Sequence, residues 1–158
     1  MDTLLVLGVG NLLRADDGLG VLAIQTLLKE SWPSGITLLD AGTFTQDLSE
    51  PLLCAKRLLV LDAVRMGTPC GTIRRLGRMD LLDETFGGLS LHDVGLLDAL
   101  DICERRTGHA PELTILGMEP HDIASWQIGL SLPLQAHFNT YLTAARRCIA
   151  ELARGNDN

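Results

Sequence analysis

Three aspartates follow apolar runs of the chain in a pattern that could hold a positive charge. Asp17 lies in GVGNLLRADDG after the first run, Asp40 lies in ITLLDAGT, and Asp62 ends LLVLD. Carboxylates that are brought together repel one another unless a proton or a metal ion supplies the missing positive charge. The three side chains are therefore candidates for catalysis or for cation binding.

His92 is a further candidate ligand, in the motif SLHD at the start of a predicted helix. The positive end of the helix dipole disfavours imidazolium and keeps the ring in the neutral form that binds metals. Two carboxylates and one imidazole suit nickel, zinc, cobalt or iron better than calcium or magnesium. The same residues also fit a plainer interpretation, in which Asp16 or Asp17 caps a helix, Asp40 and Asp62 bind loop amides, and His92 lies at the surface.

The glycine-rich loop GVGNLLRADDG is a poor match to a dinucleotide-binding loop. Leu13 stands where the third glycine of GxGxxG would fall, and the acidic pair Asp16-Asp17 would repel a pyrophosphate from the following helix. A nucleotide ligand is therefore not expected. Residues expected to shape the turns or the substrate contact are Gly10, Asn11, Asp16 and Gly42.

The sequence also argues against covalent catalysis by serine or cysteine. It contains no GxSxG motif. The four cysteines form no CxxC pair, which is unlike a zinc knuckle or a disulfide framework, and we expect buried free thiols. They are Cys54, Cys70, Cys103 and Cys148.

Hydrophobic periodicity predicts alternating strands and helices. Apolar runs predict strands at 3–9, 36–39, 57–61 and 112–117, with an edge strand at 72–76, and helical spacing predicts helices at 18–30, 45–55, 90–106 and 133–153. This order favours a three-layer α/β fold, with a twisted, mostly parallel sheet of about five strands and helices on both faces. The carboxyl ends of parallel strands share one edge, which would bring Asp17, Asp40 and Asp62 to the same edge.

Composition favours one globular domain over residues 1–158, with 154–158 as a frayed tail. Of the 158 residues, 46% are hydrophobic and 21% are charged. The formal charge of −7 disfavours nucleic acid and anionic membranes as partners. The N-terminus has no secretory pattern and no apolar run is long enough to span a membrane, so a cytoplasmic location is expected.

Taken together, the motifs resemble the hydrogenase maturation proteases, which process the large-subunit precursor of [NiFe] hydrogenases. The stretches that carry the resemblance are LGVGNLLRADDGLG at 7–20, LLDAGT at 38–43, LLVLDAV at 58–64, SLHDVGL at 90–96 and GMEP…WQIGLS at 117–131.

The resemblance implies an endopeptidase that removes a C-terminal extension from the precursor after nickel insertion. It implies that Asp17, which is Glu in some members, Asp62 and His92 recognise nickel already bound in the substrate, with cadmium or zinc as substitutes in vitro. Asp40 falls on the acidic position of the family's D-G-G-T motif and is the candidate for positioning water or the peptide, with Ala41 in place of the first glycine. A non-proteolytic metal-binding or chaperone-like module stays open as the alternative.

Overall fold

The computed structural model describes residues 3–43, 48–83 and 91–155, with the backbone alone at 91–94. The elements in chain order are β1 (Leu4–Val9), the 3₁₀ turn η1 (Ala15–Gly18), α1 (Leu19–Leu27), β2 (Ile36–Gly42), α2 (Ser49–Cys54), β3 (Arg57–Ala63), β4 (Ile73–Gly77), α3 (Arg78–Leu82), α4 (Leu91–Thr107), β5 (Glu112–Met118), α5 (Leu132–Gln135) and α6 (Phe138–Arg154).

The strands form one five-stranded sheet in the order β2-β1-β3-β5-β4. β1, β2, β3 and β5 are parallel to their neighbours, and β4 is antiparallel to β5 at the edge. The exposed side chains of Arg74 and Arg75 lie on this edge strand, where positive charge discourages pairing with another chain. The predicted mostly parallel sheet is confirmed.

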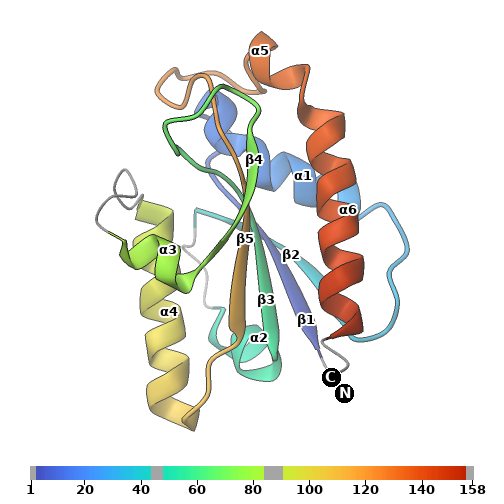
Figure 1. Cartoon of the computed structure of the whole chain (residues 1–158), viewed down its shortest axis with the longest axis vertical. Coiled ribbons are helices and arrows are strands. Elements are labelled where there is room, and N and C mark those ends of the chain that lie inside the picture. Colours follow the sequence, from blue (N-terminus) through green and yellow to red (C-terminus); the bar gives the residue numbers. More distant parts are fainter. Residues whose placement is uncertain (1–2, 44–47, 84–90, 156–158) are drawn as a thin grey trace.

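Helices cover both faces of the sheet (Figure 1). One face packs against α1 and α6, and the other packs against α2, α3 and α4. We call them the α6 face and the α4 face. Strand β3 supplies Leu59 and Leu61 to the α6 face and Leu58 and Val60 to the α4 face. This double burial explains why the strands appear in the sequence as continuous apolar runs.

Helix α1 lies unusually close to the carboxyl ends of β1 and β3 because Gly20 has no side chain. A Cβ at Gly20 would lie 2.0 Å from the carbonyl oxygen of Leu61 and 2.3 Å from that of Val9. The glycine therefore fixes where α1 begins relative to the sheet edge that carries the candidate site.

Three predicted helices differ from those in the structure. The helix predicted at 45–55 is the shorter α2, since Leu48 and Ala55 are not helical and 45–47 lie outside the described residues. The helix predicted at 18–30 ends at Leu27, whose carbonyl accepts a hydrogen bond from the Trp32 indole (2.8 Å). The last helix, predicted as one piece from Pro133, is divided into α5 and α6 by a turn at His137, whose ring packs against Gly71. Within the residues described, no helix has the length and apolar character needed to span a membrane.

Tyr141 of α6 provides a direct test of the packing between α6 and the sheet. It is the only tyrosine in the chain and is fully buried, and its hydroxyl donates to the carbonyl of Leu116 (2.5 Å). Burial, followed by the negative charge of Asp62, raises the pKa of Tyr141 well above its ordinary value. Because the pKa of Tyr141 is higher in the folded protein than in the unfolded chain, the neutral hydroxyl contributes fully to the free energy of unfolding below about pH 10. This contribution is lost as the pH rises further.

Phenolate absorbance should therefore stay absent from the native protein at pH values where free tyrosine ionises, and should appear only together with loss of helical circular dichroism. The single tyrosine makes the absorbance specific to this site. Ionisation at about pH 10 with native circular dichroism would contradict the burial of Tyr141.

Candidate active site

The candidate site lies at the edge formed by the carboxyl ends of the parallel strands. Gly8 of β1 pairs with Asp40 of β2 on one side and with Leu61 of β3 on the other. Asp62 follows Leu61 directly and pairs with Gly117 of β5. The chain therefore brings Asp40 and Asp62 to one edge of the sheet, as the strand pattern predicts.

Asp40 and Asp62 nevertheless point to opposite faces of the sheet. Asp62 lies two residues after Val60, so its side chain is directed to the α4 face, and it is only 3% exposed. Asp40 is exposed, and its Oδ2 accepts a hydrogen bond from Nε2 of Gln25 on α1 (3.2 Å), at the other face. Asp40 and Asp62 therefore share the edge but cannot act on the same face of the sheet, because side chains on a strand alternate between faces.

The side chains that the structure describes contain no group of three or more His, Cys, Asp or Glu that could hold a metal ion. The absence of such a group does not test the predicted set Asp17, Asp62 and His92, because the side chain of His92 lies outside the described residues. That metal-binding set stays a prediction.

A tight turn after β1 positions Asp17. Gly10 has φ +146°, and a Cβ there would lie 1.9 Å from the carbonyl oxygen of Asp17, so only glycine fits. The amide of Asn11 donates to Oδ2 of Asp17 (3.1 Å), and the Asn11 side chain accepts from the amide of Leu13 (3.0 Å). Gly10 also donates its amide proton to the carbonyl of Gly42 (2.7 Å), which joins this turn to the end of β2.

Asp16 is buried and has a different role from Asp17. It is 0% exposed, and its carboxylate accepts hydrogen bonds from the amides of His121 (2.9 Å), Asp122 (2.8 Å) and Ser131 (2.7 Å) and from the Ser131 hydroxyl (2.7 Å). One carboxylate therefore holds the segment between β5 and α5 against the turn that carries Asp17.

Glu119 makes a similar connection and is a residue that motif chemistry missed. It is 6% exposed, and its Oε2 accepts hydrogen bonds from the amide of Met66 (2.5 Å) and the hydroxyl of Thr68 (3.2 Å). Its backbone also pairs with Gly71 and Thr72. The motif GMEP contains Glu119, but nothing local to that motif predicts that the carboxylate is buried under the loop after β3.

Comparison with known proteins identifies the family. The family model for hydrogenase maturation proteases matches residues 21–147. The chain belongs to the hydrogenase maturation protease family.

Relatives with known names agree with this assignment. The hydrogenase expression/formation protein HoxM of Azotobacter vinelandii is 34% identical over 152 residues, which cover 94% of this chain and 72% of HoxM. The hydrogenase 2 maturation protease of Escherichia coli is 31% identical, over 84% of this chain and 82% of that protein. Among solved structures, the hydrogenase maturating endopeptidase HybD from E. coli superposes with a TM-score of 0.81 at 30% identity, over 94% of this chain and 93% of HybD.

In this member of the family, α4 begins at Leu91, so His92 lies in the first helical turn, as predicted. Further along α4, Leu96, Leu100 and Cys103 pack on the α4 face of the sheet, to which Asp62 also points. The side chain of His92 and the predicted cap Ser90 lie outside the described residues. The role of His92 as a metal ligand therefore stays a prediction.

All four thiols are free, but the expectation that they are buried is confirmed only for Cys103 and Cys148, since Cys54 is exposed and Cys70 is half-buried. Three of the thiols lack the features of an activated nucleophile. Burial, then the charges of Asp16 and Glu119, raise the pKa of Cys70. Burial likewise raises the pKa of Cys103 and Cys148. A nucleophilic cysteine requires the opposite shift, so these three thiols are kept protonated at neutral pH.

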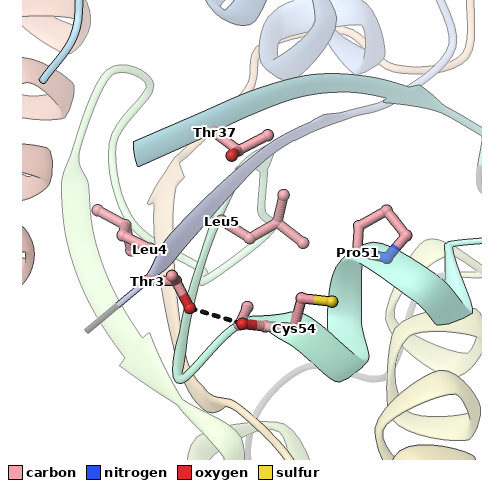
Figure 2. A pocket seen from close by; sticks show the side chains of 7 residues that line it. Thr3, Leu4, Leu5, Thr37, Pro51 and Cys54 are labelled. Carbon is pink, nitrogen blue, oxygen red and sulfur yellow. Dashed lines mark hydrogen bonds between the residues drawn. The ribbon is translucent and has the colours of Figure 1, made fainter. Parts of the chain in front are cut away.

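A pocket of the protease lies at the opposite end of the sheet from the candidate site, where the strands begin (Figure 2). It is lined by Thr3, Leu4, Leu5, Thr37, Pro51, Cys54 and Ala55. The Thr3 hydroxyl donates to the carbonyl of Cys54 across it (2.6 Å). None of the predicted site residues lines this pocket, so it does not belong to the candidate active site.

Proposed function

We propose that this protein is the endopeptidase that removes the C-terminal extension of a [NiFe] hydrogenase large-subunit precursor after nickel insertion. Membership of the maturation protease family supports the reaction class. The printed name of the E. coli relative, hydrogenase 2 maturation protease, supports the client class. The observation that carries the proposal is the buried carboxylate of Asp62 at the same sheet edge as the Asp17 turn.

The nickel ion of the precursor is the recognised substrate group in this proposal. Asp17 and Asp62 would supply carboxylate oxygens, and His92 would supply an imidazole nitrogen, a donor set that suits a borderline divalent ion. A carboxylate that is 3% exposed is poorly hydrated, so a divalent cation beside it is strongly favoured. Selection of nickel-loaded precursor follows, because an unloaded precursor brings no positive charge to this edge.

Docking of the nickel would hold the adjacent peptide bond at the sheet edge, where proximity lowers the barrier to attack by water. Asp40 is the proposed positioning group for that water or for the peptide. Asp40 lies on the α6 side of the edge, where it accepts a hydrogen bond from Gln25. This location supports a contact with the part of the substrate that lies away from Asp62.

The test compares nickel-loaded and nickel-free forms of the same precursor. Mass spectrometry should detect loss of the C-terminal extension from the loaded form alone. Equal cleavage of both forms would contradict nickel recognition and leave the endopeptidase activity intact. Binding of the loaded precursor with no cleavage would support the alternative, a non-proteolytic metal-binding or chaperone-like module.

The proposed nickel site should also bind other metals. Cd²⁺ or Zn²⁺ added to the isolated protein should bind at Asp17, Asp62 and His92, which a metal-soaked crystal structure would reveal.

No nucleotide site is proposed, so ATP and NAD should not raise the melting temperature of the protein. We also propose that the reaction takes place in the cytoplasm, and fractionation of cells that express the protein tests this location.

A further inference from the structure

Arg14 is a basic residue on the turn that carries Asp17. Its carbonyl accepts a hydrogen bond from the amide of Asp17 (3.0 Å). Its guanidinium lies over the ring of Trp126, in the loop between β5 and α5, with its carbon 4.1 Å from the ring centre. This loop lies at the end of the molecule where α5 is seen in Figure 1. The stacked ring restricts the arginine side chain, so its position is set before a partner binds.

The guanidinium of Arg14 has no anionic partner within the described ranges. It makes no ion pair and no hydrogen bond with any residue there. The carboxylates of the same region bond to backbone amides instead. Oδ2 of Asp16 accepts the amide of Asp122 (2.8 Å), and Oδ1 of Asp122 accepts those of Ala124 (2.9 Å) and Ser125 (3.0 Å). A guanidinium has five N–H donors and no acceptor, so Arg14 is available to an anion from outside the chain.

Exposed apolar side chains flank the stacked pair. Arg14 and Gln127 form an isolated bridge, in which the amide of Gln127 donates to the carbonyl of Leu13 (3.0 Å). Leu13, Trp126 and Ile128 each adjoin one of the two bridge residues in the chain and are 51%, 71% and 78% exposed. Large exposed apolar side chains that gather in this way are typical of a surface that binds another protein. A partner that covers them would exclude water from the guanidinium and strengthen its attraction to an anion.

The turn between Arg14 and Asp17 is held in a strained conformation. Ala15 has φ +48° and is the one residue other than glycine with a positive φ in the part of the chain that the structure describes. Such strain persists only where the surroundings impose it, and it is frequent at functional sites. The amide of Ala15 donates to the carbonyl of Gln127 (2.8 Å), and the next residue, Asp16, accepts four hydrogen bonds. These bonds fix Arg14 relative to Asp17.

Arg14 and Asp17 are close enough to contact one short peptide. The Cα atoms at the two ends of a turn closed by a bond from residue i to residue i+3 lie within about 7 Å of one another. An extended segment of about five residues spans about 17 Å, which covers this separation together with the length of an arginine side chain. A substrate group bound at Asp17 and a second group bound at Arg14 can therefore belong to the same short segment.

We propose that Arg14, oriented by Trp126, binds an aspartate or glutamate side chain of the precursor within about five residues of the nickel-binding residue. This inference rests on the proposed function and adds a specificity contact to it. A guanidinium binds a carboxylate through two parallel hydrogen bonds in its own plane, and a ring stacked on its face leaves that plane open. A precursor with a neutral or basic residue at this position would leave the guanidinium covered and unpaired, so it would bind less tightly.

The kinetic test uses the full-length protein and nickel-loaded precursor. Arg14→Gln should raise KM about tenfold and leave kcat within about twofold, because binding is weakened and the chemistry is not. The wild-type KM should rise between about 0.05 and 0.5 M NaCl, and this rise should be much smaller in Arg14→Gln, since the screened contact is absent. Trp126→Ala keeps the charge but loses its orientation and should raise KM about threefold.

Arg147→Gln is the matched control for the loss of positive charge. Arg147 is an exposed arginine on α6, and the KM of this variant and its dependence on salt should match those of the wild type. A wild-type KM in Arg14→Gln, or an equal increase in Arg147→Gln, would overturn the proposal.

Charge reversal identifies the partner and also controls for folding. Each aspartate and glutamate of the precursor near the cleaved bond is replaced in turn by lysine. One of these precursors should be cleaved poorly by the wild type and well by Arg14→Glu, which shows that this variant is folded and that the two charges are in contact. Failure of Arg14→Glu to recover any of the lysine precursors would overturn the proposal.

The affinity for precursor separates this inference from the proposed function. Isothermal titration calorimetry measures Kd for nickel-loaded precursor whether or not the precursor is cleaved. A Kd about tenfold weaker in Arg14→Gln, together with a wild type that does not cleave, would support the Arg14 contact and contradict the protease activity. Cleavage with an unchanged Kd in Arg14→Gln would overturn the contact and leave the protease activity intact.

Discussion

Replacing Asp62 by asparagine should lower kcat/KM for cleavage of nickel-loaded precursor more than about 100-fold. Asp62 is 3% exposed, and asparagine fills almost the same space with a neutral amide that is a weak nickel ligand. The fold should persist, since neither size nor backbone changes. A mass-spectrometric time course measures the rate, and circular dichroism checks the fold.

Asp98→Asn is the matched control for this loss, because Asp98 is an exposed aspartate on α4, and its rate should equal that of the wild type. Asp17→Asn and His92→Ala should lose activity to a similar degree if all three side chains bind nickel. Any one of them that cleaves at the normal rate would be removed from the proposed nickel-binding set.

Replacing Asp16 by alanine should lower the free energy of unfolding by about 3–5 kcal/mol. The carboxylate is 0% exposed and accepts four hydrogen bonds, from three amides and the Ser131 hydroxyl. Truncation leaves these donors without their acceptor in the interior. Urea unfolding monitored by tryptophan fluorescence and circular dichroism provides the measurement.

Asp98→Ala is the control for this loss of stability and should change the unfolding free energy by less than about 0.5 kcal/mol, as an exposed helical site. Faster hydrogen exchange at the amides of His121, Asp122 and Ser131 in Asp16→Ala would locate the damage. An unchanged urea midpoint would show that these bonds contribute nothing to stability in solution.

The strands could be predicted from the sequence because each one is marked by its own run of apolar residues. β1, β3 and β5 are buried on both faces, so each appears as an apolar run whatever its neighbours are. The break between α5 and α6 was not predictable, since it occurs at His137, whose ring packs on Gly71, a residue distant in the sequence. Helix α3 is only five residues long, too short for a periodic pattern to stand out.

The candidate site likewise has one feature that the sequence predicted and one that only the folded chain shows. The strand pattern alone predicted that Asp40 and Asp62 reach one edge of the sheet, because parallel strands end together. It did not predict that they face opposite sides, since the face depends on each strand's register with the rest of the sheet. The contact between Asp40 and Gln25 and the packing of Val60 on the α4 face appear only in the folded chain.

By itself the sequence determined the apolar strands, the acidic groups at their ends, the glycine turn and, through these motifs, the family. Only the tertiary structure decided what the adjacent Asp16 and Asp17 each do. The two residues have identical side chains, but Asp16 is buried beneath a segment that begins 105 residues later in the chain, whereas Asp17 is half-buried at the turn. Burial and hydrogen bonding depend on such distant partners, and no local pattern of residue types contains them.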